Sequence, residues 1–139
     1  MASFNKFQQF VEDLAKGVHN LSTGTLKIML TNSAPVATNS VKADLTDISA
    51  GSGYTAGGSA LSGVSAEQTS GTLALSATDL VFTASGGTIG PFRYAVLYND
   101  TPTSPADPLI AWWDYGSSIS LGDGETFTVD LATNILTIA

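Results

Sequence analysis

Histidine is the first residue type to consider for catalysis, because nucleophilic catalysis usually needs a base beside the nucleophile and histidine most often supplies it. The chain has a single histidine, His19, and no cysteine. We expect His19 to lie at the end of a helix, where the helix dipole favours a positive side chain, so a structural role is the better interpretation. One histidine without cysteine cannot form a conventional zinc site. The sequence therefore predicts no metal site.

Carboxylates are the other candidates for catalysis, and carboxylate catalysis needs two acids that converge across a cleft. Glu12 and Asp13 are adjacent on a predicted helix and point in different directions, whereas Asp123 and Glu125 lie in a turn. Asp114 directly follows two tryptophans, and we interpret it as a strand-end residue that binds nearby backbone. We therefore expect no catalytic residues and predict that the protein is not an enzyme.

A glycine-rich run at residues 51–58, Gly-Ser-Gly-Tyr-Thr-Ala-Gly-Gly, could suggest a phosphate-binding loop. The run lacks the Lys-Ser or Lys-Thr pair of such loops, and it does not follow their strand-to-helix pattern. We interpret it as a conformable loop or an extended arm that carries Tyr54. The sequence predicts no bound cofactor.

Aromatic residues and arginine, which dominate the energetics of protein interfaces, carry the remaining chemistry. Trp112 and Trp113 are consecutive, so in a strand their side chains point to opposite faces of the sheet. Only one can belong to a given core face, and the other must be covered by the helix, a second layer or a neighbouring molecule. The candidate interface residues are Phe4, Phe7, Tyr54, Arg93, Trp112 and Trp113.

The charge balance limits the classes of partner. Five basic and 12 acidic residues give a net charge of −7, and charged residues make up 12% of the chain, against about 25% in soluble domains. An acidic surface repels phosphate backbones and anionic lipids, so we expect neither nucleic acid nor a membrane as partner. A surface with few charges and many hydroxyl groups suits a protein that is covered in an assembly. A β protein rich in threonine explains the same composition equally well.

The N-terminal segment predicts one amphipathic helix over about residues 4–20, because its apolar residues recur at steps of three and four. These residues are Phe4, Phe7, Phe10, Val11, Leu14, Val18 and Leu21. We expect the helix to dock on the sheet of its own chain. The alternative is an arm that packs on a neighbouring subunit.

From Thr25 onward the apolar period changes to two, which is typical of strands. Leu26, Ile28 and Leu30 alternate with other residues and predict a half-buried strand. An irregular loop of about residues 31–60 follows, with a short helical turn near 44–48. A loop of this length is usually functional or covered by a partner.

Seven further strands are expected, at 61–68, 71–76, 80–84, 92–98, 109–113, 126–131 and 135–138. In the strand at 92–98 the alternation places residues 92, 94, 96 and 98 on one face. Short strands at near-regular spacing predict a mostly β fold: an antiparallel β-sandwich or jelly-roll-like domain with one N-terminal amphipathic α-helix. Because no repeat or linker divides the chain, we expect a single domain over residues 1–139.

Several motifs resemble those of small virion-structural proteins of tailed bacteriophages. They are Phe10-Val-Glu-Asp-Leu14, Gly17-Val-His-Asn-Leu21, Thr25-Leu-Lys27, Gly53-Tyr-Thr-Ala-Gly-Gly58, Phe82-Thr-Ala-Ser-Gly-Gly87, Gly90-Pro-Phe-Arg-Tyr-Ala-Val-Leu-Tyr-Asn-Asp100 and Trp112-Trp-Asp-Tyr-Gly-Ser-Ser118. The similarity extends over nearly the whole chain, and the last two motifs are the most specific. The resemblance implies a component of a phage particle and transfers no catalytic residue.

Within that class, an acidic, hydroxyl-rich β domain suits a capsid decoration (cement) protein that clamps neighbouring shell subunits. The expected partners are copies of itself, as a trimer or dimer, and the major capsid protein or another virion protein. The expected location is the surface of the phage particle, after synthesis in the host cytoplasm. A tail or fibre subunit is the first alternative. A surface carbohydrate-binding module that uses Trp112 or Trp113 as a stacking platform is the second.

Overall fold

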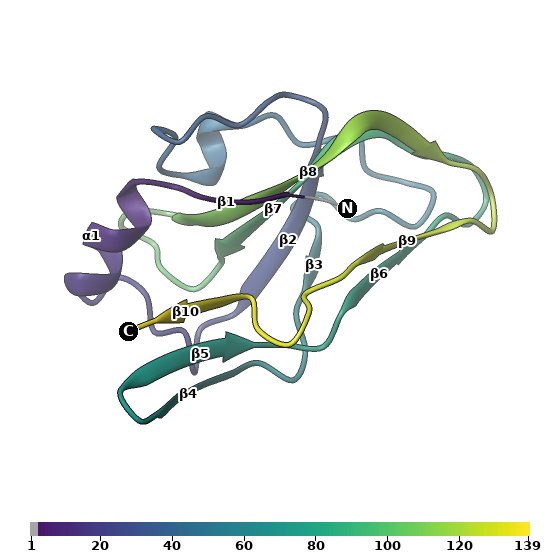
Figure 1. Ribbon diagram of the computed structural model, residues 1–139. Helices are drawn as coiled ribbons and strands as arrows, with labels where there is room; N and C mark the ends of the chain where they lie inside the picture. Colours follow the sequence, from purple (N-terminus) through teal and green to yellow (C-terminus); the bar gives the residue numbers. More distant parts are fainter. Residues whose placement is uncertain (1–2) are drawn as a thin grey trace.

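The computed structural model describes residues 3–139 and shows a mostly β fold with one α-helix near the N-terminus (Figure 1). The main sheet has five antiparallel strands in the order β1 (Ser3–Lys6), β8 (Leu109–Leu121), β7 (Ile89–Asn99), β2 (Leu26–Thr31) and β3 (Ser59–Ala60). A second layer holds two small antiparallel sheets, β10 (Leu136–Ile138)–β5 (Thr72–Ser76)–β4 (Ser65–Thr69) and β6 (Leu80–Thr83)–β9 (Thr126–Val129). The predicted antiparallel, sandwich-like fold is confirmed.

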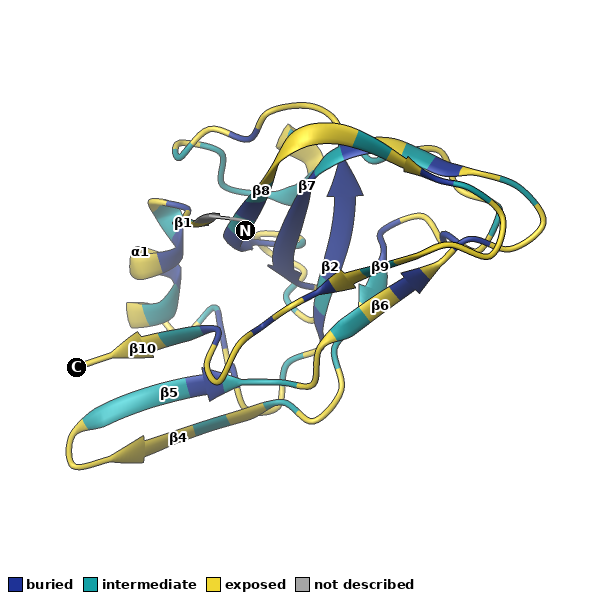
Figure 2. Cartoon of the chain, turned by 45° about the vertical axis from the view of Figure 1, so that its right-hand side comes forward, coloured by how far each residue is buried: buried dark blue, intermediate teal, exposed yellow. Residues whose placement is uncertain are grey.

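The centre of the main sheet is buried on both of its faces, as the dark strands of Figure 2 show. In β2 the consecutive residues Met29 and Leu30 are both fully buried, although their side chains point to opposite faces. The prediction of a half-buried strand is therefore wrong for β2. Its second face is covered as well, so the polar–apolar alternation is lost.

Each face of the main sheet carries its own apolar cluster. The inner cluster lies between the two layers and includes Ile28, Leu30, Leu75, Phe82, Leu97, Ile110 and Trp113. The outer cluster consists of Phe7, Met29, Val96, Tyr98 and Leu109, with Leu45 and Trp112 packed against it. The two consecutive tryptophans thus lie on opposite faces, as their spacing predicts.

The alternation in β7 is interrupted near Arg93, where the register between β7 and β8 shifts. A regular strand would place residues 92, 96 and 98 on one face, as the sequence predicts. Phe92 instead belongs to the inner cluster, whereas Val96 and Tyr98 belong to the outer one. A register irregularity of this kind changes the face of the sheet to which a side chain points, without ending the strand.

The N-terminal helix is much shorter than the predicted span of about residues 4–20. Residues 3–6 form β1, and α1 covers only Gln9–Ala15. The helix ends in a Schellman motif, in which Gly17 has a φ of +79° and the Val18 N–H donates to the Asp13 carbonyl oxygen at 2.9 Å. No helix within residues 3–139 combines the length and the apolar character that crossing a bilayer requires.

The long loop between β2 and β3 is present, as predicted, and its one helical turn is η1 (Lys42–Asp44). The sequence predicts this turn near residues 44–48, but it lies earlier in the chain. Its position follows from Asp44, whose carboxylate accepts hydrogen bonds from the backbone N–H groups of Ser40 (2.8 Å) and Val41 (3.2 Å). A carboxylate that bonds the free N–H groups before a turn holds the turn in place.

A partly buried polar network fixes the second half of this loop to the main sheet. Asp47 accepts hydrogen bonds from the Tyr54 hydroxyl and from the Gly57 N–H, the latter at 2.6 Å. The Tyr54 oxygen in turn accepts the Leu30 N–H of β2 at 3.0 Å, and the Tyr98 hydroxyl donates to the Gly57 carbonyl oxygen at 2.5 Å. Burial raises the pKa of both tyrosine hydroxyls above their ordinary values, so both stay protonated and able to donate.

Gly58 marks the closest approach of the loop to β2. Its φ is +81°, and a β-carbon built there would lie 1.8 Å from the Ile28 carbonyl oxygen. Gly71, in the turn between β4 and β5, has a similar φ of +85° but has open space around it. Alanine substitutions at the two glycines therefore separate the energetic cost of the left-handed backbone from the cost of steric overlap.

We expect Gly58→Ala to destabilise the fold by about 3 kcal/mol or more, because the added methyl overlaps the backbone of β2. The matched control, Gly71→Ala, should cost only about 1–2 kcal/mol, the cost of the left-handed backbone alone. Urea unfolding followed by fluorescence measures both values. Equal losses for the two variants would show that the loop does not press against β2.

Candidate functional site

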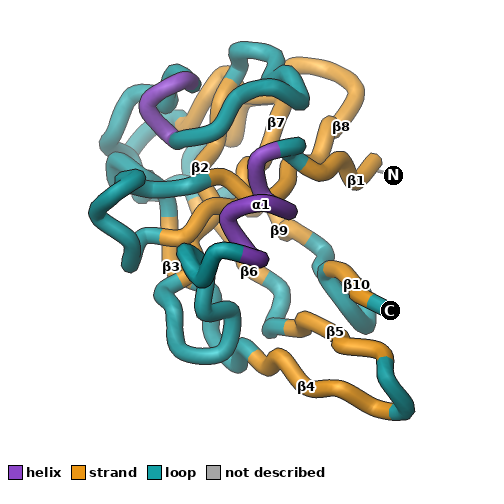
Figure 3. Tube along the Cα trace, turned by 90° about the vertical axis from the view of Figure 1, so that its left-hand side faces the viewer, coloured by secondary structure: helices purple, strands orange, loops and turns teal. Residues whose placement is uncertain are grey.

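A groove opens between the two layers on the side where β1 and β10 form the edges of their sheets; Figure 3 shows both strands on that side. One part of it, of about 450 Å³, is lined by Phe4, Arg93, Ala95, Trp113, Tyr115, residues 127–132, Asn134 and Ile135. An adjoining part, of about 390 Å³, is lined by Phe4, Lys6, Phe10 and residues 135–138. The two parts share Phe4 and Ile135, and we call them together the edge groove.

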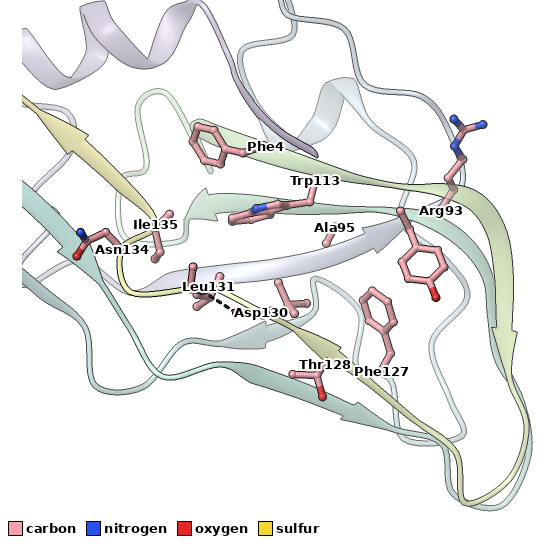
Figure 4. A pocket seen from close by; sticks show the side chains of 13 residues that line it. Phe4, Arg93, Ala95, Trp113, Phe127, Thr128, Asp130, Leu131, Asn134 and Ile135 are labelled. Atoms are coloured by element: carbon pink, nitrogen blue, oxygen red, sulfur yellow. Dashed lines mark hydrogen bonds between the residues drawn. The ribbon is translucent and has the colours of Figure 1, made fainter. Parts of the chain in front are cut away.

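Aromatic rings from β1 and β8 form one wall of the edge groove. The Phe4 ring lies 5.6 Å from the Trp113 ring, centroid to centroid, at an angle of 68° (Figure 4). Phe4 pairs directly with Trp113 in the antiparallel ladder, which brings the two side chains together. Phe4 is 42% exposed and Trp113 only 8% exposed, so Phe4 forms the outer part of this wall.

The opposite wall comes from β9 and the segment that leads to β10. Leu131 and Ile135 are buried and face the Trp113 side of the groove (Figure 4). At one end the Phe127 ring lies 5.5 Å from the ring of Tyr115, which is 47% exposed. Both walls are therefore apolar, and the solvent-exposed ring of Tyr115 lies at this end.

The polar side chains around the groove largely bond to one another or to nearby backbone. The Arg93 guanidinium binds the Asp114 carboxylate with two hydrogen bonds, Nε to Oδ1 at 2.8 Å and Nη2 to Oδ2 at 3.1 Å. The bonds from Arg93 lower the pKa of Asp114 below its ordinary value, and a weaker contribution in the same direction comes from the hydrogen bond that the Gly116 N–H donates. Asp130 accepts the Ala132 N–H at 2.8 Å. The groove is suited to apolar side chains rather than to a charged ligand.

Three of the six candidate interface residues line the edge groove: Phe4, Arg93 and Trp113. Phe7 has no exposed surface. Its ring packs on that of Trp112 on the outer face of the main sheet, with 4.5 Å between the ring centroids. Tyr54 is 3% exposed and anchors the long loop. Phe7 and Tyr54 thus support the fold and present no surface to a partner in this conformation.

The groove also contains residues that the sequence alone does not single out. Tyr115 follows Asp114 and could have been noticed as an aromatic residue near the two tryptophans. Phe127 and Ile135 gave no such signal, because each falls in an ordinary predicted strand. They reach the groove only through the pairing of β9 with β6 and of β10 with β5.

His19 is buried and lies beyond the helix, not at its end as predicted, because α1 already ends at Ala15. Its Nδ1 lies 3.2 Å from the Asn99 amide nitrogen, which can only donate, so the ring proton belongs on Nε2. Burial lowers the pKa of His19, and the nearby Asp13 carboxylate opposes this shift. Among residues 3–139, no three acidic or histidine side chains lie close enough to hold a metal ion.

Comparisons with protein families, with curated proteins and with solved structures found no match for this chain.

The burial of His19 predicts a specific dependence of stability on pH. Because the pKa is lower in the folded chain than in the unfolded one, the unfolded chain takes up a proton first as the pH falls below about 6.5. The free energy of unfolding should then decrease between about pH 7 and 5, by at most about 1.4 kcal/mol per pH unit. We expect His19→Gln to lose this slope in urea unfolding series at several pH values.

Carboxylates titrate in both proteins and provide the internal control, so the informative quantity is the difference between the two slopes. Identical slopes for the wild-type chain and His19→Gln would mean that His19 is protonated as readily in the folded chain as in the unfolded one.

Proposed function

We propose that this chain is a non-enzymatic structural protein of a tailed-phage particle, and that it acts as a capsid decoration protein that clamps neighbouring shell subunits. The edge groove carries this proposal. It is an open, aromatic-walled groove between two sheet edges, on a chain whose charged residues make up only 12% of the sequence. Concave, mostly apolar grooves of about this volume are the usual form of binding sites in proteins.

The motifs that resemble tailed-phage proteins support a structural role, because they coincide with the parts that build the sheet and the groove. The motif at residues 90–100 makes up most of β7, and the motif at 112–118 lies within β8 and contributes Trp113 and Tyr115 to the groove. The motif at 53–58 contains the residues that fix the long loop. The residues of these motifs therefore shape the fold and its groove.

A tail or fibre subunit is the main alternative, since the same groove serves any assembly of protein subunits. The carbohydrate-binding alternative has less support, because Trp113 is only 8% exposed and contacts Phe4. Trp112 is partly buried, and its ring packs against Phe7. A stacking platform for a sugar needs a ring face that a ligand can reach.

The first test compares phage particles with and without this protein. A clamp that binds the assembled shell stabilises it by mass action, by about 2.7 kcal/mol per site when its free concentration is a hundred times Kd. Particles that lack the protein should release their DNA at a lower temperature or after a milder osmotic shock. Addition of the purified protein should restore the resistance. Equal resistance of the complete and the depleted particles would contradict the cementing role.

The second test is the copy number per particle, measured by quantitative mass spectrometry of purified virions. A decoration protein should be present in numbers comparable to those of the shell subunits, because it binds a repeated site on the shell. A copy number close to that of a tail-tip or fibre protein would instead support the alternative.

A further inference from the structure

We propose that β1 accepts an extended segment of a protein partner as an added strand, and that the side chains of this segment occupy the edge groove. The inference deepens the proposed function, on which it rests for the identity of the partner as a shell protein. The way in which the partner binds is inferred from the structure of β1.

The pairing of β1 with β8 determines which of its backbone groups are free. The Phe7 N–H donates to the Ile110 carbonyl oxygen at 3.1 Å, so this pair is a hydrogen-bonded one. Hydrogen-bonded and non-bonded pairs alternate along an antiparallel ladder. Asn5, two residues earlier, therefore also bonds to β8, whereas the N–H and C=O groups of Phe4 and Lys6 point away from it. Within residues 3–139, β1 is the last strand on this side of the main sheet.

The side chains of the same two residues line the edge groove. Free backbone groups and apolar pockets thus lie side by side along one strand. Binding by strand addition needs this combination, because backbone hydrogen bonds give affinity and pockets for alternate side chains give specificity. An extended segment bound to β1 would place every second side chain in the groove, against Phe4 and Ile135.

The positive charge of Lys6 at the groove indicates which charged residue the bound segment carries. Lys6 is exposed, and no described residue forms an ion pair or ring contact with it. The other four basic side chains each have such a contact: Lys16 with Glu12, Lys27 with Asp100, Arg93 with Asp114, and Lys42 with the Tyr98 ring. The best occupant is therefore an extended apolar segment with an acidic residue opposite Lys6.

The net charge favours an unlike chain over a second copy of this one. Two copies would each bring a net charge of −7, and their mutual repulsion opposes association through a short strand. Pairing of β1 with the β1 of another copy is the competing outcome of the experiment.

The key variant is Lys6→Pro, which removes the outward N–H of β1 and the positive charge but leaves the bonds to β8 in place. Binding to particles that lack the protein should weaken at least about tenfold, with little change in the urea midpoint. Lys6→Gln keeps the N–H and should weaken binding less, with a reduced dependence on salt. The matched control is Gln68→Pro on β4, another edge strand, which should bind like the wild-type chain.

Hydrogen exchange provides a readout that does not depend on the particle. The probe is a synthetic heptapeptide in which valine alternates with threonine and one central threonine is replaced by aspartate. In NMR spectra of the wild-type chain, the amides of Phe4 and Lys6 should exchange rapidly when the chain is free and become protected when the peptide binds. A peptide with lysine in place of the aspartate should protect them less.

The outcomes separate this inference from the proposed function. If the peptide protects both amides but the wild-type chain does not bind particles, β1 is a strand-accepting edge and the phage assignment fails. If Lys6→Pro binds particles like the wild-type chain, or neither amide gains protection from the peptide, the inference fails whatever the particle assay shows. A dimer in sedimentation experiments, with both amides protected before any partner is added, would identify a second copy as the occupant and also overturn it.

Discussion

Strands β2, β7 and β8 carry apolar side chains on both faces, so water must be excluded from both sides of the main sheet. The rest of the chain is arranged around this requirement. On the outer face, Phe7 and Leu45 supply the cover. On the inner face the cover is two separate small sheets together with Phe10 of α1 and Tyr54 of the long loop, and the small sheets do not close against β1. The edge groove is the part of the inner face that the chain leaves uncovered.

Polar interactions hold these covers in position. The Asp47 carboxylate joins the Tyr54 hydroxyl to the Gly57 N–H, and through these two residues it connects the long loop to β2 and β7. A polar network of this kind specifies one arrangement of a loop that has almost no regular structure of its own. The second half of the loop is therefore held by contacts within its own chain, whereas the edge groove lies elsewhere, beside β1.

The sequence predicts the fold class well, because alternating apolar residues and turn-forming glycines mark most of the strands. It predicts the N-terminal segment poorly. Phe4, Phe7 and Phe10 have helical spacing, but Phe4 lies in β1 and packs on Trp113. Phe7 directly follows β1 and packs on Trp112, and neither contact can be seen without the partner strand. The sequence shows which aromatic residues are candidates for an interface. It does not show which of them lie in the interior and which line the groove, because this too depends on the partner strands. The edge groove joins residues near both ends of the chain with residues from β8, and spacing along the chain cannot reveal it.

The position of β1 at the edge of the main sheet also affects the order in which the fold can form. The partner of Phe4 is Trp113, so the N-terminal strand finds its place only after most of the chain has been synthesised. Contacts so distant in sequence form late, since they must first overcome the entropy of closing a long loop. During translation the aromatic side chains of the first residues stay exposed to solvent. The N-terminal segment therefore keeps its apolar side chains unpaired until β8 is available.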